Sequence, residues 1–216
     1  MKKNNRIELI VAVCLLIAFG IWTALVGLID VQPIGPEESA VGMAMLNGWF
    51  HDLTGVHMPL YNLTDWLGLL PIATAAGFAI LGLIQWITRK SIKKVDRSIL
   101  VLGGFYIAVA AAYGFFEVIP VNFRPVLIEG ELEASYPSST TLLSLCVMPT
   151  AMMQLWGRIP HKGLRWGVEI AIGVFTLFMV IVRLICGVHW LTDILGGILL
   201  SGALVTAYHA VAHSRK

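Results

Sequence analysis

Charged residues are scarce in this chain. Lys, Arg, Asp and Glu make up 13% of the 216 residues, whereas hydrophobic residues make up 57%, and the mean hydropathy is +0.81. A soluble domain cannot bury so much apolar surface. The composition therefore excludes an ordinary soluble protein and indicates a chain that crosses a membrane several times.

Cysteine is also rare. Cys14, Cys146 and Cys186 all fall in apolar segments. An odd number without extracellular spacing excludes a disulfide framework, so we expect these side chains to pack as small hydrophobes. The sequence shows no cluster of metal ligands and no obvious internal repeat. We therefore expect neither a metal nor another cofactor.

Six predominantly apolar segments follow one another along the chain. Each is close to the ~20 residues that an α-helix needs to cross the hydrocarbon core, although the fourth and sixth are less purely apolar than the first three. The sequence thus predicts an all-α polytopic membrane protein in which residues 1–216 form a single membrane domain. The expected transmembrane helices are 7–29, 66–87, 98–116, 139–156, 166–185 and 189–209.

The distribution of positive charge predicts the orientation. Of the 15 Lys and Arg residues, 13 lie in the two tails and in the connections after the second and fourth segments. With six spans these regions all fall on one side, which the positive-inside rule assigns to the cytoplasm. Both termini should then be cytoplasmic, whereas the acidic connections 30–65 and 117–138 and the short connection 186–188 face outward. A bacterial plasma membrane is the expected location.

The first outer loop, 30–65, has internal order of its own. The segment Gly35-Pro36-Glu37-Glu38 resembles a helix start, with proline and acids in the first turn. Met43, Leu46 and Phe50 then recur at spacings of three and four. The pattern indicates a short interfacial helix on the outer leaflet, and a loop packed on the bundle is the alternative.

The most informative polar residues lie near the C-terminus. Arg183, His189 and Asp193 stand in an otherwise apolar stretch, where ionisable groups are expensive and typically functional. His189 and Asp193 are four residues apart, so we expect them to share one helix face. The carboxylate can then accept a proton from one imidazole nitrogen, leaving the other free to act as a nucleophile or base. The alternative is a polar cluster that only stabilises the bundle.

Two other outer segments add anion-binding groups. Arg124, in Asn122-Phe123-Arg124-Pro125, offers a planar fork suited to phosphate or carboxylate. The segment Tyr136-Pro137-Ser138-Ser139-Thr140-Thr141 is typical of a helix N-terminus, whose free N–H groups bind anions. Taken singly, these segments also fit an interfacial arginine and an ordinary capped helix end. Taken together with His189, they predict a phosphate pocket that contains a nucleophile.

The motifs resemble those of the phosphatidic acid phosphatase type 2 superfamily. The family pattern is Lys-x6-Arg-Pro, then Pro-Ser-Gly-His, then Ser-Arg-x5-His-x3-Asp. Here the order is kept over roughly residues 60–210, and the motif core is expected within 117–209. The corresponding segments are Glu117-x6-Arg124-Pro125, Pro137-Ser138-Ser139-Thr140 and Val182-Arg183-x5-His189-x3-Asp193.

This resemblance implies a role for each matching residue. His189 would attack phosphorus and carry a phosphohistidine intermediate, and Asp193 would orient it. Arg124 and Arg183 would hold the phosphate oxygens. The resemblance adds Ser138 and Ser139 as further phosphate-binding residues, and no metal would be needed.

Three positions depart from the family pattern. Glu117 replaces the lysine, Val182 replaces the serine, and Thr140 occupies the position of the histidine that protonates the leaving group. Threonine is no general acid near neutral pH, a role typically worth about 10²–10⁴ in rate. Three explanations remain open: an introduced substitution, a natural non-catalytic relative, or a leaving group that needs little acid help, such as the phosphate of a diphosphate lipid.

The sequence therefore predicts a membrane lipid phosphatase with its site at the outer leaflet. The candidate substrates are phosphatidic acid, phosphatidylglycerol phosphate and polyprenyl phosphate or diphosphate, entering sideways between helices. The bilayer and a phosphorylated lipid are the expected partners, and nucleic acid is not. The alternatives are a relative that binds or moves phosphorylated lipids without hydrolysing them and, with less support, a small-anion transporter, because transporters often place charges at mid-membrane and show repeats.

Overall fold

The fold, a computed structural model that describes residues 3–212, is built from α-helices, with isolated β-bridges but no β-strand in this part of the chain. Two short 3-10 turns, Pro36–Glu38 and Ile92–Lys94, lie between helices. The α-helices are α1 (Lys3–Leu28), α2 (Ala44–Thr54), α3 (Met58–Leu67), α4 (Leu69–Arg89), α5 (Arg97–Val118), α6 (Ser139–Trp156), α7 (Lys162–Ile185) and α8 (Leu191–Ala212).

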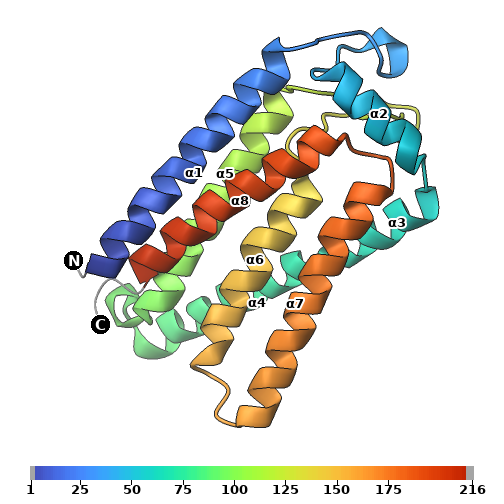
Figure 1. The fold of residues 1–216 in the computed structure, drawn as a ribbon. Coiled ribbons are helices and arrows are strands. Elements are labelled where there is room, and N and C mark those ends of the chain that lie inside the picture. Colours follow the sequence, from blue (N-terminus) through green and yellow to red (C-terminus); the bar gives the residue numbers. More distant parts are fainter. Residues whose placement is uncertain (1–2, 213–216) are drawn as a thin grey trace.

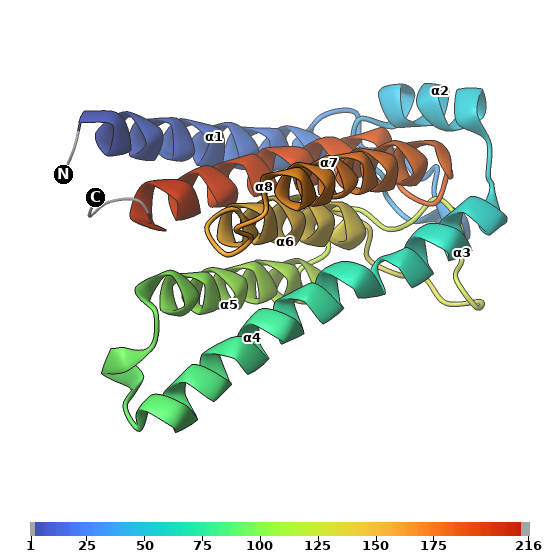
Figure 2. The same ribbon diagram turned by 90° about the horizontal axis from the view of Figure 1, so that it is seen from below.

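The long helices form a bundle around α6 and α8 (Figure 1). Helix α8 packs against α1, α5 and α6, and α6 also packs against α4, α5 and α7. Helix α2 crosses one end of the bundle, and α3 leads into α4, which diverges from the other helices as it runs away from that end (Figure 2). We call the end that carries α2 and α3 the α2 end.

Within residues 3–212, five helical segments are long and apolar enough to cross a membrane: Asn5–Leu28, Met58–Arg89, Arg97–Val118, Lys162–Ile185 and Leu191–Ala212. They confirm an all-helical membrane protein. The fourth predicted span, 139–156, coincides with α6, which is not among them. Helix α6 carries buried polar side chains, including Thr141, Ser144 and Thr150, which lower its hydropathy. Because other helices surround α6, these side chains need not face lipid, and the sixth crossing stays a prediction.

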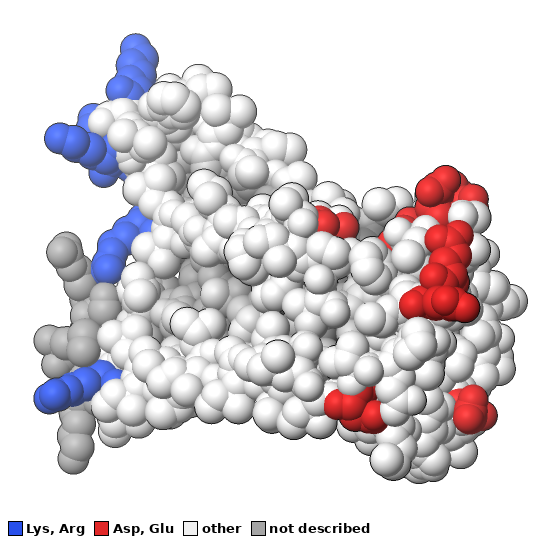
Figure 3. Space-filling model, turned by 90° about the horizontal axis from the view of Figure 1, so that it is seen from above, with Lys and Arg blue, Asp and Glu red and all other residues white. Residues whose placement is uncertain are grey.

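Charge is separated between the two ends of the molecule. Figure 3 shows Lys and Arg at one end, Asp and Glu at the other, and a wide uncharged surface between them. The connections α4–α5 and α6–α7 supply Arg89, Lys90, Lys93, Lys94 and Arg158, and we call this the basic end. Lys2, Arg215 and Lys216, which also entered the orientation prediction, lie outside the described residues.

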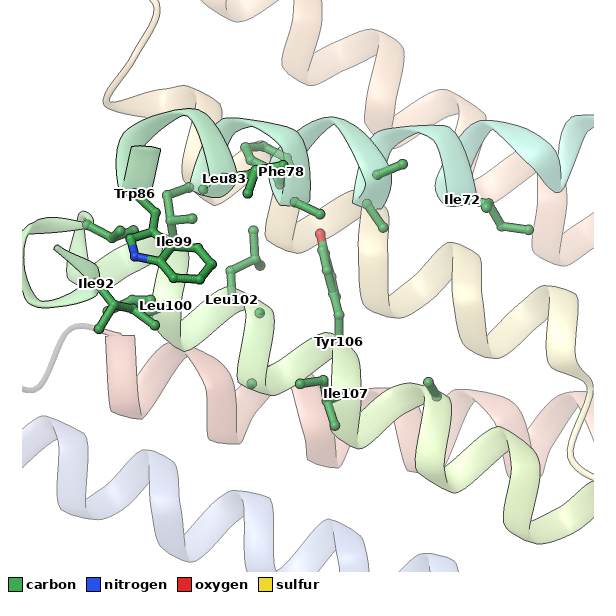
Figure 4. Close-up of a pocket in the computed structure, with 18 residues that line it drawn as sticks. Ile72, Phe78, Leu83, Trp86, Ile92, Ile99, Leu100, Leu102, Tyr106 and Ile107 are labelled. Atoms are coloured by element: carbon green, nitrogen blue, oxygen red, sulfur yellow. The ribbon is translucent and has the colours of Figure 1, made fainter. Parts of the chain in front are cut away.

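An apolar groove of about 780 Å³ runs between α4 and α5. Phe78, Leu83 and Trp86 line it from α4, and Leu102 and Ile107 line it from α5 (Figure 4). The groove reaches from Ile72, one turn into α4, to Ile92 near the basic end. The groove lies between two helices that are apolar enough to cross a membrane. Its walls therefore face the hydrocarbon core of the bilayer.

The structure corrects the prediction for loop 30–65. Only one 3-10 turn forms at Pro36–Glu38, and the helix begins at Ala44. Its buried residues are Ala44 and Asn47, whereas Leu46 is exposed, so the stripe through Leu46 is not the packed face. The physical reason is polar: the Asn47 amide donates to Gly42 O and Thr192 Oγ1 and fixes that face on the bundle.

Candidate active site

His189 lies in the five-residue connection between α7 and α8, at the α2 end. The prediction that His189 shares a helix face with Asp193 is therefore wrong, because α8 begins only at Leu191. Gly187 permits the turn: its φ is +70°, and a Cβ there would lie 1.8 Å from Gly55 O. The Cys186 carbonyl accepts a hydrogen bond from the His57 N–H at 2.9 Å, so the connection is fixed against the segment before α3.

Asp193 still lies beside the imidazole. Its Oδ2 is 3.6 Å from His189 Nδ1, and both side chains are buried. The same oxygen accepts the Trp190 N–H at 2.9 Å. Since Trp190 precedes the first residue of α8, this is the reach-back half of a capping box. The Asp193 carboxylate thus caps the N-terminus of α8 and also faces His189 Nδ1.

Arg124 reaches the other imidazole nitrogen from a small hairpin. The Arg124 N–H donates to Glu133 O, and the Ser135 N–H donates to Asn122 O. At the tip, Glu129 and Gly130 both have positive φ, 52° and 88°, which is the combination of a type I′ turn.

The hairpin sets the contacts of the Arg124 side chain. Arg124 Nη1 lies 3.4 Å from His189 Nε2, and Arg124 Nε pairs with the Glu133 carboxylate at 3.0 Å. Arg124 is buried, with 7% of the residue exposed. The Arg124 guanidinium, the His189 imidazole and the Asp193 carboxylate therefore follow one another in a line.

Arg183 is the largest fully buried side chain among the described residues, 1% exposed. It lies in the last turn of α7, and its Nη1 donates to Thr64 Oγ1 of α3 at 3.1 Å. Its Nη2 is 3.9 Å from Asp65 Oδ1. Its Nε is buried and has no hydrogen-bond partner among the described residues.

Both predicted arginines lie over one aromatic ring. The guanidinium carbons of Arg124 and Arg183 are 5.7 and 4.6 Å from the centroid of Tyr61. The two like charges, distant along the chain, are therefore brought to the same place, and His189 Nε2 adjoins the first of them.

The N-terminus of α6 borders this arrangement. The helix starts at Ser139, and the Ser138 N–H donates to Asp193 O at 3.1 Å. Ser138 Oγ is buried and has no partner within residues 3–212. Thr140 is 9% exposed, and its methyl group faces the backbone of Gly68, at the α3–α4 junction.

Ser139 and Glu117 share a different recess. They line it with Tyr113, Ser135 and Pro137, whereas the two arginines and His189 do not. Glu117 is exposed at the end of α5. The predicted role of Ser139 in phosphate binding stays a prediction.

Burial and charge keep the His189 imidazole neutral. Desolvation is the largest cause, and the positive charges of Arg124 and Arg183 add to it, so the pKa of His189 lies well below its ordinary value of 6.5. A neutral imidazole has a lone pair available for attack. Burial first, and then repulsion by the two guanidinium groups, therefore favours the nucleophilic form of His189.

Several side chains of the site were not predicted from the sequence. Glu133 entered it only as one of several loop acids, and Tyr61 and Thr64 did not enter it. The one local signal for the α3 residues is the spacing of Tyr61, Thr64 and Asp65, which puts them on one helix face. Within the described chain, no three His, Cys, Asp or Glu side chains come together in a way that could hold a metal ion.

The fold and this site define a helical membrane protein with a buried cationic and imidazole cluster at one end. Comparison with known families adds that residues 118–216 match the model of the PAP2 superfamily. The resemblance inferred from the motifs is confirmed there. No match is found among the curated proteins.

One solved structure with this fold is described as the first transmembrane PAP2 type phosphatidylglycerolphosphate phosphatase from Bacillus subtilis. The two chains share 20% sequence identity with a TM-score of 0.56, over 95% of this chain and 97% of the other. At that identity the comparison shows the fold alone, and the shared fold extends over almost the whole chain.

Proposed function

We propose that this protein hydrolyses a phosphorylated lipid through a phosphohistidine intermediate on His189. The single observation that carries the proposal is the line from Arg124 Nη1 to His189 Nε2, at 3.4 Å, and from His189 Nδ1 to Asp193 Oδ2, at 3.6 Å. It joins an anion ligand, a nucleophile and an orienting carboxylate inside a membrane protein. The PAP2 match and the phosphatase fold support the same reaction class.

The chemistry follows from the atoms of this line. Asp193 favours the tautomer with the proton on Nδ1, which leaves the lone pair on Nε2. Nε2 attacks phosphorus, the P–O bond to the lipid breaks, and the N–P bond of phosphohistidine forms. Arg124 and Arg183 bind the phosphate oxygens and neutralise their charge. Water then cleaves the N–P bond and releases phosphate.

The departing lipid oxygen shapes the choice of substrate. Thr140 stands where the family histidine would protonate that oxygen. A lipid alkoxide needs such a proton, whereas a departing phosphate is far less basic. The arrangement therefore favours a diphosphate lipid over a monoester, with phosphatidic acid and phosphatidylglycerol phosphate as slower substrates.

The groove between α4 and α5 supports a lipid as the substrate. It begins at Ile72, one turn from Gly68, whose backbone faces Thr140. A phosphate held by the arginines can thus continue into a hydrocarbon chain that lies along the groove. The apolar walls match such a chain.

The site is proposed to face the extracytoplasmic side of a plasma membrane. The basic end carries the Lys and Arg residues of the short connections, so the positive-inside rule supports cytoplasmic termini and six crossings. The phosphate site is at the opposite, α2 end.

A second candidate function is binding or transfer of phosphorylated lipids without hydrolysis. The observation that favours it is the buried Thr140 in the first turn of α6, where the reaction would need an acid. Glu117 in place of a cation points the same way.

Purified protein with a panel of lipid monophosphates and diphosphates tests the proposal. We expect phosphate release, fastest from the diphosphate, and loss of release in His189→Ala because the nucleophile is removed. His161→Ala, a histidine at the basic end, is the matched control and should keep the rate. Unchanged release in His189→Ala would remove this histidine from the mechanism. Tight lipid binding without any release would favour the second candidate.

A further inference from the structure

Helix α3 presents one polar face to the two arginines. Tyr61, Thr64 and Asp65 have the spacing i, i+3 and i+4, so they lie together on that face. Arg183 contacts all three: the ring centroid at 4.6 Å, the hydroxyl at 3.1 Å and the carboxylate at 3.9 Å. Arg124 contacts the same ring at 5.7 Å.

The arginines need such a support. Two like charges in a buried place repel each other, and each loses solvation. The face of an aromatic ring carries negative electrostatic potential and attracts cations, by about 0.5–2 kcal/mol depending on desolvation. Tyr61 is 8% exposed, so its interaction with the guanidinium groups is shielded from water.

We infer that Tyr61 is a positioning residue for phosphate binding: its ring holds Arg124 and Arg183 in the arrangement that receives one phosphate group. The inference rests on the proposed function. It goes beyond the family match, because α3 lies outside residues 118–216, and none of the three motifs includes it. Thr64 acts with the ring, since its hydroxyl oxygen accepts the Arg183 N–H and fixes the plane of that guanidinium.

The ring, and not the phenol hydroxyl, makes the contact. Two substitutions therefore separate the effect of the ring from that of the hydroxyl. Tyr61→Phe keeps the ring, whereas Tyr61→Leu removes it and keeps an apolar side chain of similar reach. Leu63→Ala changes an exposed residue of the same helix, 44% exposed, and serves as the matched control.

The experiment measures inhibition by inorganic phosphate together with kcat and KM for a lipid phosphate, in detergent. For Tyr61→Leu we expect the inhibition constant of phosphate to rise about tenfold and kcat/KM to fall by a similar factor. Tyr61→Phe and Leu63→Ala should stay within about twofold of the unmodified protein in both quantities. A variant that merely folds poorly lowers the active fraction and leaves the inhibition constant unchanged.

An unchanged inhibition constant in Tyr61→Leu overturns the inference, as does an equal rise in Tyr61→Phe, which would assign the effect to the hydroxyl. Direct titration of phosphate by calorimetry separates this outcome from failure of the proposed function. An unmodified protein that binds phosphate but hydrolyses no lipid contradicts hydrolysis, and the affinity of Tyr61→Leu still tests the ring. An unmodified protein that binds no phosphate contradicts both.

Discussion

At the scale of single residues, the chemistry depends on which nitrogen and which oxygen face each other. The sequence singled out Arg124, Arg183, His189 and Asp193, because ionisable groups stand out in apolar surroundings. The structure brings these four residues together at one end of the bundle. The reasoning that His189 and Asp193 share a helix face was wrong, although the two side chains do meet. The contact of Arg183 with Thr64 joins residues 119 apart in the sequence and leaves no local pattern. The pairing of Arg124 with Glu133 depends on a hairpin that the sequence did not predict.

Introducing a histidine at position 140 tests whether a proton donor at that position speeds hydrolysis. We expect Thr140→His to raise the hydrolysis rate of a monophosphate lipid about tenfold or more, because general acid catalysis typically supplies at least that factor. The rate with a diphosphate lipid should change much less, since its leaving group needs little protonation.

Thr140→Val is the control, since it removes the hydroxyl and keeps the shape. Its rate should match that of the unmodified protein. Equal acceleration of both substrate classes by Thr140→His would contradict the leaving-group explanation.

The protonation of His189 gives a test that needs no substrate. Its pKa is lowered by burial and then by Arg124 and Arg183, so NMR titration of this imidazole should give a midpoint below 6.5. In Arg124→Gln one of the lowering charges is lost, and the midpoint should rise. A midpoint at or above 6.5 in the unmodified protein would contradict the electrostatic description.

The lowered pKa of His189 also determines how this group changes the free energy of unfolding with pH. The folded state binds fewer protons at His189 than the unfolded state, so this group lowers the free energy of unfolding as the pH falls below 6.5. At higher pH the imidazole is neutral in both states, and its contribution vanishes.

At the scale of elements, long helices were predictable and their connections were not. The predicted spans 98–116 and 139–156 correspond to α5 at 97–118 and α6 at 139–156, because length and apolarity are local properties. The hairpin at 122–135 was not predicted, since its four backbone hydrogen bonds and its type I′ turn leave only a weak sequence signal, at Glu129 and Gly130. The start of α2 was placed too early, because Asn47 and not the apolar stripe fixes its packed face.

The connection that carries His189 depends on one glycine. In Gly187→Ala a Cβ would lie 1.8 Å from Gly55 O at a φ of +70°, so the connection must move. We expect the variant to lose about 2 kcal/mol or more of stability and about 10²-fold in kcat through displacement of the imidazole.

Thermal unfolding and steady-state kinetics measure the two effects. Gly173→Ala in α7, where an added Cβ meets nothing within 4 Å, should be neutral or stabilising. Full activity in Gly187→Ala would show that the connection does not position the nucleophile.

At the scale of the whole molecule, charge separation and apolar length define how the bundle sits in a membrane. Composition alone predicted a helical membrane protein, and five apolar helices confirm it. Hydropathy could not reveal that α6 is a central helix with buried polar residues. A helix that packs inside a bundle does not contact lipid and so does not have to be uniformly apolar.

Cysteine labelling from the two sides tests the orientation. With a membrane-impermeant maleimide on intact cells, we expect Glu131→Cys to react and Lys93→Cys to react only after permeabilisation. The parent protein, with its own three cysteines, gives the background. The opposite pattern would place the phosphate site on the cytoplasmic side and contradict the proposed orientation.

The most direct measurement is mass-spectrometric detection of the phosphoryl group on the protein after rapid quenching during turnover of a ³²P-labelled diphosphate lipid. We expect an acid-labile, alkali-stable label on His189, absent in His189→Ala and weakened in Arg124→Gln. Continued phosphate release without any label on His189, or a label on another residue, would contradict the nucleophilic role of this imidazole.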